Sequence, residues 1–214
     1  METAKIEPRV TPSYWKAAVG ELKEQDRILG KLISDYGGEM LCSQGDAFTT
    51  LTRAIVGQQI SVKAAASVWY KLTLQLTEIS PHIVFSADTD LLRTCGLSAR
   101  KTSYIKDLSA HFLMGIYDEA QWQSMDDESL IKLLIQFKGI GRWTAEMFLI
   151  FYMLRPAVLP LDDIGLQRAI SIHYNQNKVV DKHLPKEIAE KWQPWRSVAT
   201  WYLWRSLDPI PVAY

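Results

Sequence analysis

A short glycine-containing segment in the second half of the sequence has the composition of an anion-binding turn. Gly139 and Gly141 flank a single apolar residue, Ile140, between two stretches whose apolar residues have helical spacing. Glycine allows positive φ and lets the backbone approach another surface closely. The first amides of the following helix have no acceptor within it and carry partial positive charge, so a phosphate is their natural partner. Lys138 and Arg142 place further positive charge beside the turn.

Two other interpretations of this segment remain open on the residues alone. One is a nucleotide-binding glycine loop, with residues 133–137 as its strand and Asp162 or Asp163 as the distant acid. Thr144 stands at the third glycine position of that motif, however, and no alternation of strands and helices surrounds it. The other is a purely structural corner between two helices, with Ile140 fixing the turn to the core.

Tryptophan is the other residue type whose distribution could serve chemistry. The chain has eight tryptophans, and five of them lie from position 143 onward, namely Trp143, Trp192, Trp195, Trp201 and Trp204. Core packing explains most of them, because indole rings are large apolar groups. For one or two of them, a stacking surface for a flat ligand stays open.

The elements that position these residues are helices, because the apolar spacing is helical almost throughout the chain. Capping residues, prolines at first turns and glycines after last turns mark the ends. No segment shows sustained alternation of period two. The sequence therefore predicts an all-α protein of about ten helices, over residues 28–33, 48–56, 61–72, 90–95, 98–114, 127–134, 142–151 and 194–207, with others starting near 80, 162 and 185.

Composition excludes some classes of protein. Lys plus Arg equals Asp plus Glu, at 24 each among 214 residues, so the chain is not coated in positive charge. A local basic face stays compatible with this balance, since phosphate binding needs only a few donors. Cys42 and Cys95 are far apart and form neither a disulfide framework nor a zinc or iron–sulfur ligand set, so two buried free thiols are expected. No metal site is predicted.

Neither the start of the chain nor its apolar segments predict a membrane or a secreted protein. Residues 1–8 have no apolar core of a signal peptide. The longest apolar run, residues 147–154, is far too short to cross a bilayer. We therefore expect a cytoplasmic protein.

Four ordered motifs carry a resemblance to a known family. The segments 137–145 and 159–168, together with 55–65 and a Trp-Arg-Ser sequence at 195–197 that leads to Trp204, occur in the order of the helix-hairpin-helix DNA glycosylase superfamily. Within it the chain resembles the 3-methyladenine DNA glycosylase II type, in a compact form without the extra N-terminal domain that some relatives carry. The resemblance spans roughly residues 46–207.

The resemblance implies a fold and a division of the chain. We expect two helical subdomains with the active-site cleft between them. Residues 1–45 and 160–214 would form one subdomain from the two chain ends. Residues 46–159 would form the other, which carries the helix-hairpin-helix at about 130–153.

The resemblance also implies that Asp163 is the catalytic residue. The invariant aspartate of the superfamily falls several residues before an arginine, and Arg168 selects Asp163 over Asp162. Such a carboxylate stabilises the positive charge that develops on the sugar when a glycosidic bond breaks, and it can orient the attacking water. Asp162 is expected to cap the helix, and capping by both aspartates is the simpler explanation that stays open.

Three residues are implied to form the base pocket. Trp143 and Trp204 correspond to pocket aromatics of the family, and Met147 stands where relatives can have tyrosine. An indole face attracts a cationic ring such as 3-methyladenine by about 0.5 to 2 kcal/mol. Trp143 also replaces the lysine of strand-cutting relatives, so no Schiff base can form and a monofunctional enzyme is implied. Core packing of Trp204 is the alternative.

The remaining implied residues contact DNA. Gln59 would enter the duplex as the base leaves it, with Gln58 beside it; the alternative is that both cap the break between two helices. The implied DNA-binding set is Gln58, Gln59, Lys138, Gly139, Ile140, Gly141, Arg142 and Thr144.

The implied activity is release of alkylated purines from double-stranded DNA, leaving an abasic site for base excision repair. A glycosylase for hypoxanthine or etheno adducts and a non-catalytic DNA-binding hairpin are the alternatives. We expect a monomer without a cofactor. A monovalent cation held by carbonyls around residues 137–139 would fit the superfamily, although no residue requires it.

Overall fold

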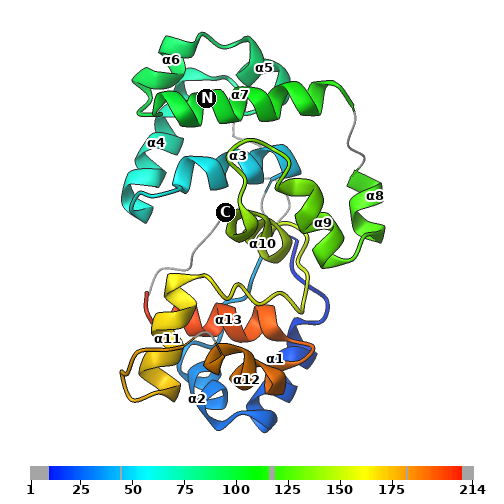
Figure 1. Cartoon of the computed structure of the whole chain (residues 1–214), viewed down its shortest axis with the longest axis vertical. Coiled ribbons are helices and arrows are strands. Elements are labelled where there is room, and N and C mark those ends of the chain that lie inside the picture. Colours follow the sequence, from blue (N-terminus) through cyan, green and yellow to red (C-terminus); the bar gives the residue numbers. More distant parts are fainter. Residues whose placement is uncertain (1–9, 44, 116–118, 182, 209–214) are drawn as a thin grey trace. The chain divides into compact units, whose positions relative to one another are not determined.

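The computed structural model describes residues 10–43, 45–115, 119–181 and 183–208, and the regular elements in this part of the chain are all helices. It forms thirteen α-helices and one 3-10 helix without any β-strand, so the predicted all-α class is confirmed for these residues (Figure 1). An isolated antiparallel bridge joins Val10 and Ser43. Residues 1–8, in which the sequence predicts no signal peptide, lie outside the described ranges.

The predicted starts of three helices are confirmed. In each, a side-chain oxygen accepts a hydrogen bond from the amide three residues further on, which satisfies one of the donors that a helix start leaves unpaired. These helices are α3 (Ala47–Gly57) after Asp46, α4 (Val62–Gln75) after Ser61, and α7 (Ala99–Leu113) after Ser98.

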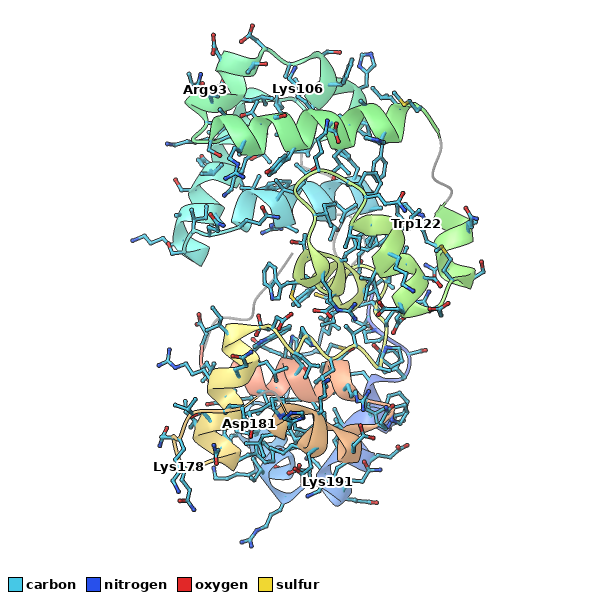
Figure 2. All side chains as sticks on the ribbon, in the orientation of Figure 1. Arg93, Lys106, Trp122, Lys178, Asp181 and Lys191 are labelled. Atoms are coloured by element: carbon cyan, nitrogen blue, oxygen red, sulfur yellow. The ribbon has the colours of Figure 1, made fainter. Side chains whose placement is uncertain are left out.

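Two helices were not predicted, α1 (Trp15–Gln25) and α8 (Glu119–Ser124). The start of α1 carries no capping side chain, since Tyr14 stands at its N-cap without a cap hydrogen bond. Helix α8 is short and is held by tertiary packing, because its fully buried Trp122 contacts the rings of Phe112 and Phe148 edge to face (Figure 2). Neither feature is visible as a local pattern.

The chain divides into two compact units. Unit 2 is the continuous segment 45–148, in which α3 packs on α4 and α7, and α5 packs on α7. Its other helices are α5 (Pro81–Ser86), α6 (Thr89–Thr94), α8, α9 (Asp127–Leu134) and the first part of α10 (Arg142–Phe151).

Unit 1 is built from both ends of the chain, residues up to 44 and residues from 149 onward. Helices α1, α2 and α13 pack on one another, and α11 packs on α13. The sequence places the return to this unit at residue 160, whereas the structure places it inside α10, because Phe151 stacks on Trp204 of α13. The helices are α1, α2 (Arg27–Asp35), α11 (Ile164–Tyr174), α12 (Leu184–Ala189), η1 (Glu190–Trp192) and α13 (Arg196–Arg205).

Two smaller expectations can be compared with the described residues. No helix among them is both long and apolar enough to span a bilayer.

Cys95 is buried, whereas Cys42 is only half-buried, and neither is in a disulfide. The expectation that both thiols are buried is therefore wrong for Cys42, which lies outside the helices near the Val10 bridge.

A buried carboxylate joins three elements of unit 1. Oδ1 of Asp26 caps α2 by accepting hydrogen bonds from the amides of Ile28 and Leu29, at 2.9 and 3.2 Å. Its Oδ2 accepts from the Tyr174 hydroxyl at 2.8 Å and from the Trp192 indole N–H at 3.1 Å. Burial, and then the charge of Asp26, raise the pKa of Tyr174. Asp26 thus fixes α2 to the end of α11, the helix that begins at Asp163.

Replacement of Asp26 by alanine removes the cap and leaves the buried Trp192 indole and the half-buried Tyr174 hydroxyl without their acceptor. We expect Asp26→Ala to lower the free energy of unfolding of unit 1 by about 2–5 kcal/mol, measured by urea unfolding with tryptophan fluorescence. Asp181→Ala is the matched control, because Asp181 is exposed and its carboxylate accepts hydrogen bonds from the backbone amides of His183 and Leu184 (Figure 2). Equal losses for the two variants would contradict a special role for the buried carboxylate.

Candidate active site and nucleic-acid interface

The turn between α9 and α10 requires glycine at position 139 for two reasons. Gly139 has φ +83°, a conformation that L side chains rarely adopt. A Cβ at this position would also lie 2.2 Å from Cδ2 of Tyr104, on α7. Ile140 is buried, as predicted, and its amide donates to the carbonyl of Phe137 at 3.1 Å. Gly141, by contrast, has open space where a side chain would stand.

The start of α10 lies beside this turn and has backbone amides that its own helix does not pair. Its first intrahelical hydrogen bond runs from the amide of Ala145 to the carbonyl of Gly141, at 3.0 Å. The amides that precede Ala145 have no acceptor within the helix, as at any helix start. Together with exposed Gly141, they form the anion-binding arrangement that the sequence predicts.

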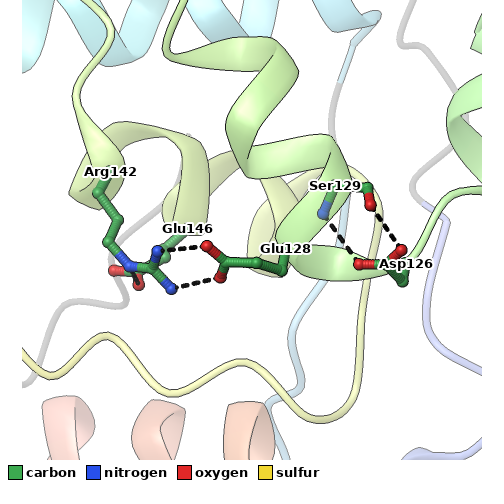
Figure 3. Close-up of polar contacts among 5 residues, drawn as sticks. All are labelled: Asp126, Glu128, Ser129, Arg142 and Glu146. Atoms are coloured by element: carbon green, nitrogen blue, oxygen red, sulfur yellow. Dashed lines mark hydrogen bonds and ion pairs between the residues drawn. The ribbon is translucent and has the colours of Figure 1, made fainter.

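Both cations of the hairpin are paired with carboxylates. Lys138 Nζ lies 2.8 Å from Oδ1 of Asp107, on α7. The Arg142 guanidinium donates two hydrogen bonds to Glu128 of α9, at 2.9 and 2.8 Å, and its Nε donates to Glu146 at 3.0 Å (Figure 3). Hydrogen bonding to Glu128 chiefly raises the pKa of Arg142 and, from the other side, lowers that of Glu128. Lys138 and Arg142 therefore lie beside the turn with their positive charge balanced by carboxylates.

The acidic start of α9 lies in the same region. Asp126 caps this helix, as its carboxylate accepts from the amide and the hydroxyl of Ser129 at 2.9 and 2.6 Å (Figure 3). These hydrogen bonds lower the pKa of Asp126. Arg142 joins the first turn of α9 to α10 through Glu128, so it braces the two helices of the hairpin.

Gln58 and Thr144 face the protein rather than solvent. The side-chain amide of Gln58 donates to the carbonyl of Gly139 at 2.7 Å and to the Thr144 hydroxyl at 3.3 Å. Thr144 is 3% exposed, and its contact with DNA stays a prediction. Gln59, in contrast, is exposed at φ +58°. The Gly139 carbonyl, in the segment where a monovalent cation would fit the superfamily, thus accepts a hydrogen bond from a side chain.

Asp163 is held by two hydrogen bonds at the start of α11. Its Oδ1 accepts from the amide of Leu166 at 2.6 Å and from the indole N–H of Trp204 at 2.7 Å. The residue is 9% exposed. Asp162, which was expected to cap this helix, is exposed, and the cap is Asp163. The predicted catalytic residue therefore also starts the helix, and both hydrogen bonds orient its carboxylate.

Trp204 is fixed by stacking as well as by this hydrogen bond. Its ring lies parallel to that of Phe151, with centroids 5.8 Å apart and an interplanar angle of 9°. Gly165 completes the group, because a Cβ there would lie 3.1 Å from Oδ1 of Asp163 and 3.2 Å from Cδ1 of Trp204. Sequence reasoning missed Gly165. The signal that could have found it is a glycine in the first turn of a helix, where glycine is unfavourable.

The other two predicted pocket residues share a face of α10. Trp143 and Met147 are one helical turn apart, and the first is half-buried while the second is 2% exposed. They belong to unit 2 with the hairpin, whereas Asp163 and Trp204 belong to unit 1.

The turn at Gly139, the helix start that follows it and an oriented carboxylate are typical of a class, the helix-hairpin-helix proteins that act on DNA. Comparison with protein families agrees: the model of the HhH-GPD superfamily of base excision DNA repair proteins matches residues 52–194. The chain belongs to this superfamily.

Several relatives are similar over most of the chain. DNA-3-methyladenine glycosylase 1 of Schizosaccharomyces pombe is 31% identical over 189 residues, which are 86% of this chain and 83% of the relative. The crystal structure of a DNA-3-methyladenine glycosidase from Bacillus halodurans superposes with a TM-score of 0.78 and 30% identity, covering 93% of this chain and 92% of that one. The S. pombe 3-methyladenine DNA glycosylase Mag1, in complex with abasic DNA, gives 0.77 and 28%, covering 89% and 96%.

The two hairpin glycines should respond differently to alanine. Gly139→Ala forces positive φ on a side chain that overlaps Tyr104, so we expect it to lower the free energy of unfolding by about 2–5 kcal/mol. Gly141→Ala should change this free energy by no more than about 0.5 kcal/mol yet weaken DNA binding, because its methyl group keeps the backbone from a phosphate. Denaturant unfolding and fluorescence anisotropy measure the two effects. Unchanged binding by Gly141→Ala would rule out close backbone approach there.

The hydrogen bond from Trp204 to Asp163 can be removed while an aromatic ring is kept for stacking on Phe151. We expect Trp204→Phe to slow single-turnover base release about tenfold, since one hydrogen bond to a charged group is lost. Trp195→Phe is the control, because that indole N–H donates to Glu21 at 2.6 Å within the same unit. The same loss in both variants would mean that the orientation of Asp163 does not depend on Trp204.

Proposed function

We propose that the protein is a monofunctional DNA glycosylase that releases alkylated purines such as 3-methyladenine from double-stranded DNA and leaves an abasic site. The observation that carries this proposal is the Asp163 carboxylate, oriented by the Leu166 amide and the Trp204 indole. The printed names of the S. pombe and B. halodurans relatives support the substrate class.

Asp163 acts on the sugar. The bond between C1′ and the ring nitrogen breaks, and both electrons leave with the base, which neutralises the charge that alkylation placed on the purine. Positive charge develops at C1′, where a fixed carboxylate stabilises it without reorganising at the moment of reaction. The attacking water donates a hydrogen bond to Asp163, and its surplus proton leaves to solvent. No general acid is needed, because the alkylated base is already a good leaving group.

The residue at position 143, Trp143, determines whether the enzyme only releases the base or also cuts the DNA strand. A lyase step needs an amine that forms a Schiff base with the sugar, and an indole cannot supply one. Trp143, Met147 and Trp204 are the proposed base-recognition residues, with the indole faces attracting the cationic ring. Met147 stands where relatives can have tyrosine, so the range of lesions that the pocket accepts stays open. Hypoxanthine and etheno adducts are therefore the second candidate substrates.

The proposed grip on DNA comes from backbone rather than from cations. Lys138 and Arg142 are engaged with Asp107, Glu128 and Glu146. The amides at the start of α10 and exposed Gly141 are therefore the proposed phosphate contacts, with Gln59 entering the duplex. We propose that the protein works as a monomer, which sedimentation velocity with and without DNA would check.

Base release by two aspartate variants tests the proposal. Methylated duplex DNA is incubated with the protein, and the released bases are separated and identified. We expect Asp163→Asn to release them about a hundredfold more slowly or worse, because asparagine keeps the shape and loses the charge. Asp162→Asn is the matched control, an adjacent and exposed aspartate whose change should leave the rate near that of the wild type.

The alternatives give distinct results in the same assay. DNA binding without release of any base would favour a non-catalytic hairpin module. Release of hypoxanthine or etheno bases, but not of methylated purines, would select the other lesion class. Undiminished release by Asp163→Asn would remove Asp163 from its role.

A further inference from the structure

The loop between α3 and α4, residues 58–61, presents Gln59 in a conformation that its own sequence does not favour. We call it the wedge loop. Gln59 has φ +58°, which is uncommon for a residue other than glycine. Such a conformation persists only when its surroundings determine it.

Lys101 holds the main chain of the wedge loop. From the first turn of α7, its Nζ donates to the carbonyl of Val56 at 2.8 Å and to that of Gln58 at 2.7 Å. The last carbonyls of a helix lack partners within it and carry partial negative charge, so an ammonium group is well matched to them. Burial lowers the pKa of Lys101, as expected for a cation withdrawn from water into a protein contact.

The side chain of Gln58 holds the loop from another direction. It donates to the Gly139 carbonyl and the Thr144 hydroxyl, so the residue before Gln59 is tied to the hairpin. The carbonyl and the side chain of Gln58 are therefore fixed by different helices, α7 and α10, within one unit. Gln59 follows directly from this doubly fixed residue.

We propose that Lys101 is a positioning residue, which holds the wedge loop so that Gln59 is already placed to enter the duplex when the damaged nucleotide leaves it. The proposal rests on the proposed function, because a preset wedge matters only where a base must leave a paired duplex. Extrusion costs unstacking and unpairing free energy, and that cost is least for a mismatched base. A loop that must first become ordered adds to the cost.

The substitution Lys101→Met removes the three donors and keeps the unbranched stem. Single-turnover base release is measured on two duplexes that differ only in the base opposite the lesion, a normal partner or a mismatch. We expect a loss of about tenfold on the paired duplex and a loss of about twofold or less on the mismatched one. A 2-aminopurine beside the lesion reports unstacking directly, and its fluorescence gain should fall in the variant.

Two matched variants separate positioning from general structure. Lys106, on the same helix, likewise donates to the carbonyls of Phe85 and Ala87 near the end of α5, away from the wedge loop (Figure 2). Lys106→Met should leave the ratio of the two rates at the wild-type value. Lys101→Arg should restore much of the paired-duplex rate, because the guanidinium can donate to both carbonyls. If Lys101→Met does not fold, Lys101→Gln takes its place.

Equal losses on both duplexes, no loss on either, or the same selective loss in Lys106→Met would each overturn the role of Lys101. A selective loss that Lys101→Arg recovers supports it. If the wild type releases no base, the proposed function has failed. The 2-aminopurine signal of the wild type and the variants then tests Lys101 alone, and equal signals overturn its role.

Discussion

At Gly139 the ring of Tyr104 occupies the place of a side chain, and this contact sets α7 against the hairpin. The same helix supplies Lys101 to the wedge loop and Asp107 to Lys138. Residues 101, 104 and 107 are three apart and thus lie along one side of α7. A single helix therefore supports both elements that are proposed to contact DNA. A shift of α7 would move the wedge loop and the hairpin together.

The charged side chains near the hairpin pair with one another, so they hold helices together more than they attract DNA. Each hairpin cation has a carboxylate partner, and Arg142 has two. The Arg142–Glu128 pair is exposed on both sides, so it contributes little to stability and water can replace a partner at small cost, whereas Asp107 and Glu146 are largely withdrawn from solvent. This local balance matches the zero net charge of the whole chain. In the proposed function, the backbone amides at the start of α10, rather than these cations, provide the selectivity for a phosphate.

Much of the hairpin could be predicted because its signals are local. Two glycines around Ile140, and the caps Asp46 and Ser61, act on neighbours a few residues away. The choice of Asp163 over Asp162 needed the resemblance, because either aspartate could cap a helix. In the structure, Asp163 itself is the N-cap of α11.

The contacts that sequence reasoning missed join residues that are far apart along the chain. Gln58 bonds Gly139 across 81 positions, and Lys101 bonds Gln58 across 43. Gly165 matters only because Trp204, 41 residues from Asp163, lies against it. No periodicity or motif encodes such pairs, since they exist only once the helices have packed.

Because unit 1 is built from two separate segments of the chain, its parts cannot pack together in the order in which they are synthesised. Helices α1 and α2 leave the ribosome before segment 45–148, but part of their packing surface is α13, the last helix of the described chain. The intervening segment 45–148 is continuous and can complete its own core while synthesis goes on. Helices α1 and α2 must therefore wait, incompletely packed, until α13 has been made. A ribosome that stalls after residue 148 would release the hairpin and the wedge loop without Asp163.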